Sequence, residues 1–168
     1  MLTYVYLPPG GAFDHRYLVM SPIQLTAGAS SVTQPPLNEL ARYTNSSGVR
    51  WSTTGPAIGY SGNWNLDKSL GYVMTSADPS APSNKIEECE SGWAGHPDFL
   101  LTNDGMCVSG GFTRLRTAGW VYTNKQPNTE PLYRCYSGAS TSYHFASNDP
   151  NCEGMGTMEW LLGYTVVQ

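Results

Sequence analysis

The sequence predicts an all-β domain, and three observations support this fold class. Charged residues make up 13% of the 168 residues, about half of the usual share of roughly 25%. The chain contains 18 Gly and 12 Pro, and aromatic residues reach 12%. A pattern with the spacing of short strands and turns also recurs three times. These features argue against a coiled coil, a long-helix bundle and a charged disordered chain.

Each copy of the pattern opens on a predicted strand. Leu132–Cys135 has a counterpart in Ile86–Cys89 and a weaker one in Leu40–Tyr43, and each step is 46 residues (43 to 89 and 89 to 135). A turn follows each strand, because Ser-Gly stands at 91–92 and at 137–138 and Asn-Ser-Ser-Gly at 45–48. The repeated spacing therefore predicts three equivalent strand-and-turn units.

A second predicted strand carries a recurring aromatic residue. Phe99 and Phe145 each lie ten positions after a Cys, and Trp51 takes the corresponding place in the first copy. We expect these three rings to be core residues. The residue before each ring changes its chemistry from copy to copy and either lines equivalent surface pockets or is a solvated strand end: Arg50, Asp98 and His144.

Each copy ends with an Asn-Asp turn and a strand that begins Gly-aromatic. The turns are Asn103-Asp104 and Asn148-Asp149, and the first copy has Gly-Pro at 55–56 near this place. The closing strands contain a Gly followed by an aromatic residue that we expect to be buried: Gly71-Tyr72, Gly119-Trp120 and Gly163-Tyr164.

The three copies predict one all-β domain over residues 1–168. The copies span 39–84, 85–129 and 130–168. Residues 1–38 form an N-terminal segment whose predicted strands, Leu2–Leu7 and Tyr17–Met20, are either a hairpin that closes the fold or a degraded fourth copy. Pseudo-threefold repetition of units of about 45 residues favours a β-trefoil-like arrangement, and a small propeller or a sandwich is the alternative.

The four cysteines are predicted to form two disulfides. Pairing Cys89 with Cys107 and Cys135 with Cys152 joins equivalent places of two copies, at separations of 18 and 17 residues. Each bond stabilises the fold by about 3 kcal/mol on the chain-entropy model. The Cys and His spacings do not fit a zinc site. Disulfides indicate an oxidising compartment and therefore a secreted protein.

The third copy contains four motifs in order: Pro-Leu-Tyr-Arg-Cys-Tyr at 131–136, His144-Phe145, Asp-Pro-Asn-Cys-Glu-Gly at 149–154 and Leu-Leu-Gly-Tyr at 161–164. With these motifs it resembles short tandem aromatic repeats of secreted bacterial and fungal proteins, which are often appended to hydrolases or peptidases. The second copy departs with Asp98 in the place of His, and the first copy has Arg50-Trp51 there and lacks both Cys. The resemblance implies a secreted accessory domain that binds glycans or surfaces.

Several classes of function do not fit this sequence. The net charge is −4 and the nine Lys and Arg are scattered, so we expect no nucleic-acid binding. No apolar run approaches the roughly 18 residues that cross a bilayer, so we expect no membrane insertion. Common catalytic motifs are lacking, so we expect no enzyme. Carboxylates that could still meet as a glycosidase-like pair are Asp98, Asp104, Asp149 and Glu153.

The residues fit a carbohydrate-binding module or lectin best, with a glycan or polysaccharide as its partner. Sugar rings stack on aromatic side chains, and adjacent polar groups orient their hydroxyls. The candidate ligand-binding residues are the aromatics of polar loops and the variable polar position: Trp64, Trp93, Tyr143, Arg50, Asp98 and His144. The alternative is a non-catalytic structural or protein-binding accessory domain of a larger secreted protein.

No cofactor is predicted, and calcium is the one metal that the loops suggest. Side-chain oxygens suited to calcium occur in the Asn-Asp turns, at Asn103, Asp104, Asn148, Asp149 and Asn151. No Asp-x-Asp-x-Asp-Gly loop accompanies them. The oligomeric state is not predicted.

Overall fold

The computed structural model describes residues 33–55, 63–91, 97–138 and 142–168, which all belong to one compact unit, Val32–Gln168. The predicted N-terminal strands Leu2–Leu7 and Tyr17–Met20 lie outside the described residues. Nine strands of the described part form one antiparallel sheet, accompanied only by two short helices. The all-β prediction is therefore confirmed.

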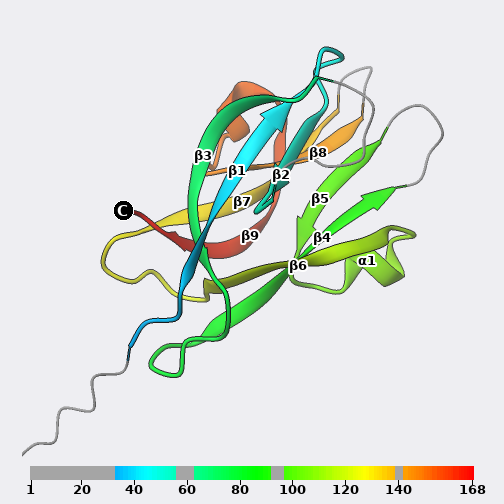
Figure 1. The fold of residues 1–168 in the computed structure, drawn as a ribbon. Helices are drawn as coiled ribbons and strands as arrows, with labels where there is room; N and C mark the ends of the chain where they lie inside the picture. Colours follow the sequence, from blue (N-terminus) through cyan, green and yellow to red (C-terminus); the bar gives the residue numbers. More distant parts are fainter. Residues whose placement is uncertain (1–32, 56–62, 92–96, 139–141) are drawn as a thin grey trace, which may run out of the picture. The chain divides into compact units, whose positions relative to one another are not determined.

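The strands follow one another as three segments, each of which contains three strands (Figure 1). The first segment consists of β1 (Leu37–Thr44), β2 (Arg50–Thr53) and β3 (Asn65–Met74). The second consists of β4 (Ser83–Ser91), β5 (Asp98–Thr102), α1 (Met106–Ser109) and β6 (Thr113–Tyr122). The third consists of β7 (Thr129–Ser137), β8 (Tyr143–Ser147), the 3-10 helix η1 (Cys152–Gly154) and β9 (Thr157–Val166).

The first strand of each segment pairs with both of the others. Thus β1 pairs with β2 and β3, β4 with β5 and β6, and β7 with β8 and β9, always antiparallel. Each long pairing also contains two register shifts, and the second shift leaves one unpaired residue on the closing strand: Asp67, Leu115 and Glu159. A β-bulge of this kind re-aims side chains next to it, which matters for the charges described below.

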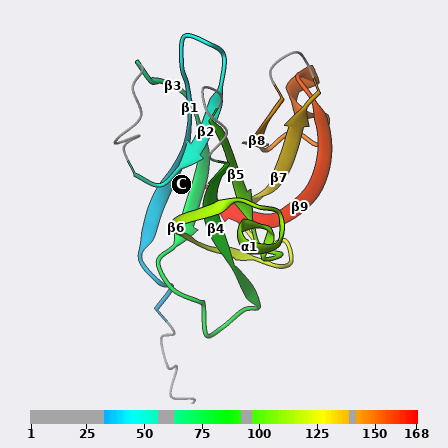
Figure 2. The same ribbon diagram turned by 90° about the vertical axis from the view of Figure 1, so that its right-hand side faces the viewer.

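The closing strands β3, β6 and β9 bring the three segments together. Each of them pairs with the other two at one position, and Figure 2 shows the strands of the first segment on the left of the view and those of the third on the right. Gly is required at these crossings, because a Cβ on Gly71, Gly119 or Gly163 would lie 2.8, 2.7 or 2.6 Å from a backbone oxygen of a neighbouring closing strand. This explains the Gly that recurs before each closing aromatic residue.

A central apolar cluster draws residues from all three segments. Its members are fully buried or nearly so: Leu40, Leu70, Val73, Ile86, Leu101, Ala118, Val121, Leu132, Ala146 and Leu162. Tyr72, Trp120 and Tyr164 are only half-buried and pack at the edge of a second cluster, so the prediction that they are buried is met in part.

The register of the second strands corrects the alignment that the aromatic spacing predicts. Trp51 and Phe145 pair with Tyr43 and Cys135, but the residue opposite Cys89 is Leu100, and Phe99 lies one position earlier. The reason is a connection that is one residue longer, since β4 and β5 are separated by residues 92–97 whereas β7 and β8 are separated by 138–142. Asp98 is accordingly out of register with Arg50 and His144. The predicted burial of all three rings is nevertheless confirmed.

Both predicted disulfides are confirmed. Cys89 bonds to Cys107 with their Cα atoms 5.6 Å apart, and this bond ties α1 to β4. Cys135 bonds to Cys152 with a Cα separation of 5.9 Å, which ties η1 to β7. Each bond therefore fixes the turn that precedes a closing strand.

Candidate functional site

The structure brings four of the predicted site residues together in two pairs. In the first pair, an Nη of Arg50 donates a hydrogen bond to the Tyr143 hydroxyl, and the guanidinium lies 5.7 Å from the centre of that ring. The other Nη of Arg50 lies 2.9 Å from the Met155 sulfur. Tyr143 belongs to β8 and is only 7% exposed, so the prediction of an exposed loop aromatic is wrong for this residue. The ring packs in a buried cluster of the third segment with Cys135, Phe145 and Cys152, and Arg50 from the first segment contacts it as well.

The second pair joins Asp98 to His144. The backbone N–H of His144 donates to one Asp98 oxygen at 2.6 Å, and the imidazole Nδ1 lies 2.7 Å from the other. The second ring nitrogen lies 3.3 Å from a Glu159 oxygen. His144 is 9% exposed. Asp98 and His144 thus meet between the second and third segments and do not line separate equivalent pockets.

The other two predicted site residues, Trp64 and Trp93, provide no exposed aromatic face among the described residues. Trp64 is half-buried and packs edge-on against Trp51 and Phe99, with ring centres 5.6 and 5.8 Å apart. Its indole nitrogen is buried and has no hydrogen-bond partner among the described residues. Trp93 lies outside the described residues. We refer to Arg50, Tyr143, Asp98 and His144 as the hairpin joint, because their polar groups connect the hairpins to one another.

A buried charge on the first strand of each segment forms a further set of contacts between segments. These residues are Arg42, Glu88 and Arg134, which are 1%, 0% and 6% exposed. An unpaired buried charge is very costly, so each of them requires partners of opposite charge or hydrogen-bonding groups. The three differ in the side chain that lies opposite on the closing strand.

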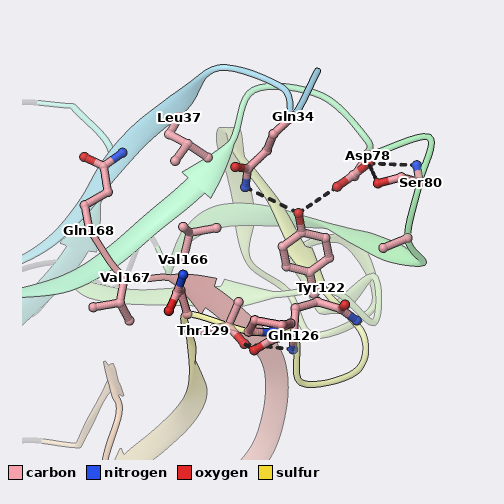
Figure 3. Close-up of a pocket in the computed structure, with 13 residues that line it drawn as sticks. Gln34, Leu37, Asp78, Ser80, Tyr122, Gln126, Thr129, Val166, Val167 and Gln168 are labelled. Atoms are coloured by element: carbon pink, nitrogen blue, oxygen red, sulfur yellow. Dashed lines mark hydrogen bonds between the residues drawn. The ribbon is translucent and has the colours of Figure 1, made fainter. Parts of the chain in front are cut away.

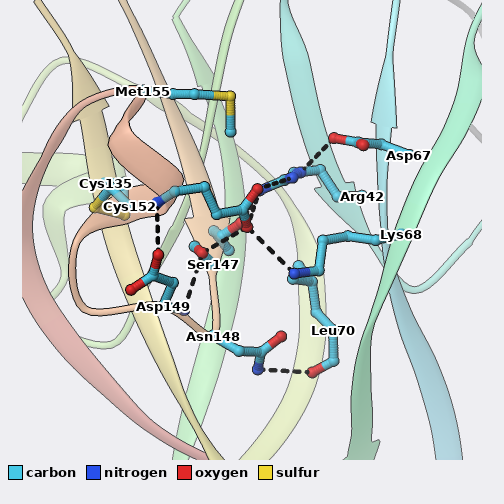
Figure 4. A network of polar contacts seen from close by, with 12 residues as sticks. Arg42, Asp67, Lys68, Leu70, Cys135, Ser147, Asn148, Asp149, Cys152 and Met155 are labelled. Atoms are coloured by element: carbon cyan, nitrogen blue, oxygen red, sulfur yellow. Dashed lines mark hydrogen bonds and ion pairs between the residues drawn. A yellow bond between two sulfur atoms is a disulfide. The ribbon is translucent and has the colours of Figure 1, made fainter.

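Arg42 lies in a closed network between the first and third segments (Figure 4). Its guanidinium donates to both Glu153 oxygens at 3.1 and 2.7 Å, to Asp67 at 2.7 Å and to a backbone carbonyl of β8 at 3.0 Å. Ser147 donates to Glu153 at 2.7 Å, and Lys68, which pairs with Arg42 across the strands, lies 3.3 Å from the same carboxylate. Hydrogen bonding by Arg42 lowers the pKa of Glu153 to about 2. We call these five residues the Arg42 network.

Glu88 is closed off in a comparable way between the second and first segments. Trp51 and Thr53 donate to its two oxygens at 2.7 and 3.0 Å. Arg116, which pairs with Glu88 across the strands, donates to the carboxylate at 2.9 Å. A cation from the closing strand therefore completes this contact as well.

The contact around Arg134 is different, because the residue opposite it is Trp160. The guanidinium of Arg134 lies 3.1 Å from Glu159 and 3.5 Å from Asp104. It also donates to the Thr102 hydroxyl at 3.3 Å. An indole cannot pair with these carboxylates as Lys68 and Arg116 pair with theirs.

A pocket of about 260 Å³ lies beside Trp160, and we call it the Trp160 pocket. The indole is 51% exposed, and Leu161 beside it is 39% exposed. The amide of Asn103 donates to a backbone carbonyl of β9 at 2.9 Å, which fixes its orientation, and the Asp104 side chain is 33% exposed. The lining combines one aromatic residue, apolar surface and several polar groups: Asn84, Asn103, Asp104, Thr123, Trp160, Leu161, Leu162 and Gly163.

Trp160 is absent from the candidates that the sequence suggests, although a signal for it exists. It stands three residues before Gly163, and the residues three before Gly71 and Gly119 are Lys68 and Arg116. One copy therefore carries an aromatic residue where the others carry a cation. The other half of the pocket, Asn103 and Asp104, comes from the second segment.

A second pocket, of about 500 Å³, lies where β3, β6 and β9 end (Figure 3). Its polar groups are engaged with one another, since the Tyr122 hydroxyl donates to Asp78 at 2.6 Å and Ser80 donates to the same carboxylate at 2.7 and 2.6 Å. Burial raises the pKa of Tyr122 to about 12, and the hydrogen bond from Ser80 lowers the pKa of Asp78. Tyr122 is 6% exposed, so this pocket offers no open aromatic face among its described residues.

The Asn-Asp turns use their oxygens within the chain. Asp149 accepts backbone N–H groups of Asn151 and Glu153 at 2.9 and 3.1 Å, and the Thr102 hydroxyl donates to Asp104. Within the described ranges, no three His, Cys, Asp or Glu residues gather in a way that could hold a metal ion. The same ranges contain no helix long and apolar enough to span a membrane.

Comparison with known proteins gives no relative: no protein-family model matches the chain, and neither does any curated protein or solved structure.

Proposed function

We propose that this chain is a carbohydrate-binding module, a lectin-like domain without a catalytic role, and that its binding site is the Trp160 pocket. The observation that carries the proposal is a half-exposed indole beside fixed amide and carboxylate groups in a concave surface. The apolar face of a sugar ring stacks on such an indole, while Asn103 and Asp104 bond to its hydroxyls.

The polar wall of the pocket is held in place before any ligand binds. Asn103 is anchored to β9 by its hydrogen bond to the Leu162 carbonyl. Asp104 lies three residues before Cys107, whose disulfide to Cys89 fixes the turn on β4. Groups that are already ordered lose little conformational entropy on binding, which supports a recognition site.

The finer description of the fold belongs to the same proposal. We propose that the three segments are copies of one unit around a pseudo-threefold axis, in a β-trefoil-like arrangement. The shared strand pairing, the two register shifts in each long pairing and the buried charges at steps of 46 residues support it. Three residues before the closing-strand Gly, the first two copies carry Lys68 and Arg116, and only the third carries an indole, Trp160. We therefore expect one glycan site and not three.

Secretion is also part of the proposal. Two disulfides within a chain of this size are typical of oxidising compartments, and they are compatible with an extracellular protein. A glycan of a cell surface or a polysaccharide outside the cell is then the partner that we expect.

A glycan array tests the proposal directly. The oxidised chain is labelled and screened beside Trp160→Ala and beside Lys68→Ala, which changes the corresponding strand position of the first segment. We expect the wild type and Lys68→Ala to bind the same coherent set of sugars and Trp160→Ala to lose them while it remains folded by circular dichroism. Silence of the wild type across a broad array contradicts the proposal. It favours a protein-binding accessory domain, in which exposed Met158 and Leu161 contact the partner.

A further inference from the structure

The amide of Asn103 presents a fixed hydrogen-bond acceptor in the Trp160 pocket. Its Nδ2 group donates to the Leu162 carbonyl at 2.9 Å, which holds the plane of the amide. The Oδ1 atom lies at the other end of the same group and makes no hydrogen bond to another described residue. A ligand therefore has to offer this oxygen an N–H or O–H group.

A second amide, that of Asn84, lines the same pocket and is not engaged. Asn84 is an exposed residue of β4 and pairs with Val121 across the strands. Within the part of the chain that the structure describes, its side chain forms no hydrogen bond, so it can both donate to a ligand and accept from it. The corresponding strand positions of the other segments carry Asn38, opposite Val73, and Glu130, opposite Thr165.

Apolar surface adjoins the indole in this pocket. Leu161 follows Trp160 directly, lines the pocket and is 39% exposed. Covering such a side chain with an apolar group of a ligand is favourable, whereas a hydroxyl placed against it gains nothing. The pocket thus combines a stacking surface, a fixed acceptor, an unengaged amide and an apolar contact.

We propose that the ligand of the Trp160 pocket is an N-acetylated amino sugar and that its acetamido group distinguishes it from a plain hexose. The acetamido N–H donates to the Asn103 oxygen, its carbonyl accepts from the Asn84 amide and its methyl group contacts Leu161. The apolar face of the sugar ring stacks on Trp160. A hydroxyl at the same ring position can bond to one of the amides but leaves Leu161 uncovered. This inference rests on the proposed function, since it specifies the ligand of that same pocket.

Calorimetric titration with two matched oligosaccharides tests the inference. One is the β-1,4-linked tetramer of N-acetylglucosamine and the other is the β-1,4-linked tetramer of glucose, which differs from it only by a hydroxyl in place of each acetamido group. We expect the acetylated tetramer to bind at least about tenfold more tightly, as a further hydrogen bond together with a buried methyl group gives.

Three variants separate the contributions of the pocket residues. Asn84→Ala should reduce the affinity for the acetylated tetramer about fivefold and leave that for the glucose tetramer unchanged. Asn38→Ala is the matched control, because it removes the same exposed side chain at the corresponding strand position of the first segment, and it should bind as the wild type does. Trp160→Ala should abolish binding of both tetramers.

The outcomes distinguish this inference from the proposed function. Equal or tighter binding of the glucose tetramer, lost in Trp160→Ala, overturns the acetamido preference and keeps the pocket as a sugar site. An equal loss of affinity for both tetramers in Asn84→Ala also overturns it. If neither tetramer binds, the glycan array decides: a bound set in which every member carries an acetamido group supports the inference, and any other bound set overturns it. A silent array overturns the proposed function itself.

Discussion

The Arg42 network and the Trp160 pocket occupy corresponding places in the strand pairing, yet one is closed and the other open. In both, a buried arginine on the first strand faces the closing strand and reaches a carboxylate from another segment. In the Arg42 network Lys68 bonds to that carboxylate. In the other place Trp160 leaves a pocket of about 260 Å³ with a half-exposed indole.

One side chain separates a closed charge contact from the open pocket that we propose as the binding surface. A carboxylate that already bonds to two cations, as Glu153 does, has little capacity to bind a ligand. An exposed ring beside fixed polar groups, as at Trp160, leaves surface that a ligand can contact. The hairpin joint resembles the closed Arg42 network, because the Asp98 carboxylate bonds to the backbone N–H and the imidazole of His144. We therefore expect the closed contacts to govern stability and the open one to govern binding.

Arg42→Ala should disrupt the Arg42 network and cause the largest loss in the free energy of unfolding. The variant leaves Glu153 and Asp67 without their principal buried partner, and breaking such a pair costs about 3 to 5 kcal/mol of the free energy of unfolding. Urea denaturation measures this loss. Lys68→Ala, which removes the more exposed cation, should cost less than about 1 kcal/mol. Equal losses in the two variants would contradict the view that the buried arginine holds this contact.

Removing each disulfide should separate stability from binding. The double variants Cys89→Ala/Cys107→Ala and Cys135→Ala/Cys152→Ala open loops of nearly equal length, so each should lose about 3 kcal/mol in urea denaturation. Only the first pair supports the turn that carries Asn103 and Asp104. Sugar affinity should therefore fall in the first variant alone, and an equal fall in both would show that the disulfide does not position the pocket wall.

Acid should weaken the Arg42 network in a defined pH range. The pKa of Glu153 is lowered from 4.5 to about 2 in the folded chain, so its contribution to stability is fully present above pH 4.5 and is lost as the pH falls toward 2. The free energy of unfolding of the wild type should thus decrease over this range. Glu153→Gln should show a shallower decrease there, whereas the exposed control Glu130→Gln should follow the wild type. A parallel slope for Glu153→Gln would refute the assignment.

Two features of the fold are predictable from sequence because each demands a particular residue type. A disulfide requires Cys at both ends, and the crossing of closing strands leaves no room for a Cβ at Gly119 or Gly163. Both constraints therefore require the same residue type in every copy in which they apply. For this reason the pairing of Cys89 with Cys107 could be predicted, and the recurring Gly is explained by the crossings.

The candidate site is harder to predict from sequence, because it depends on contacts between segments. Phe99 and Phe145 both lie ten positions after a Cys, but the connection between β4 and β5 is one residue longer than that between β7 and β8. An error of one residue in the register moves a side chain to the other face of a strand. The hydroxyl of Tyr143 bonds to Arg50, which lies 93 residues away in the chain. Trp160 acquires its polar neighbours only when the second segment packs beside the third.

Exchanging the closing-strand side chains Trp160 and Lys68 should have the smallest effect on the free energy of unfolding. It tests most directly whether this one position separates the closed network from the open pocket. Trp160 is 51% exposed and the Lys68 side chain is 37% exposed, so Trp160→Lys and Lys68→Trp should each change the free energy of unfolding by less than about 1 kcal/mol. In Trp160→Lys the new ammonium group can reach Asp104, so the pocket should close and sugar binding should be lost. Lys68→Trp places an indole beside Glu153 but leaves Arg42 bonded to that carboxylate. Titration of this variant should reveal at most weak new binding, because an indole creates a site only where a polar wall beside it is open to the ligand.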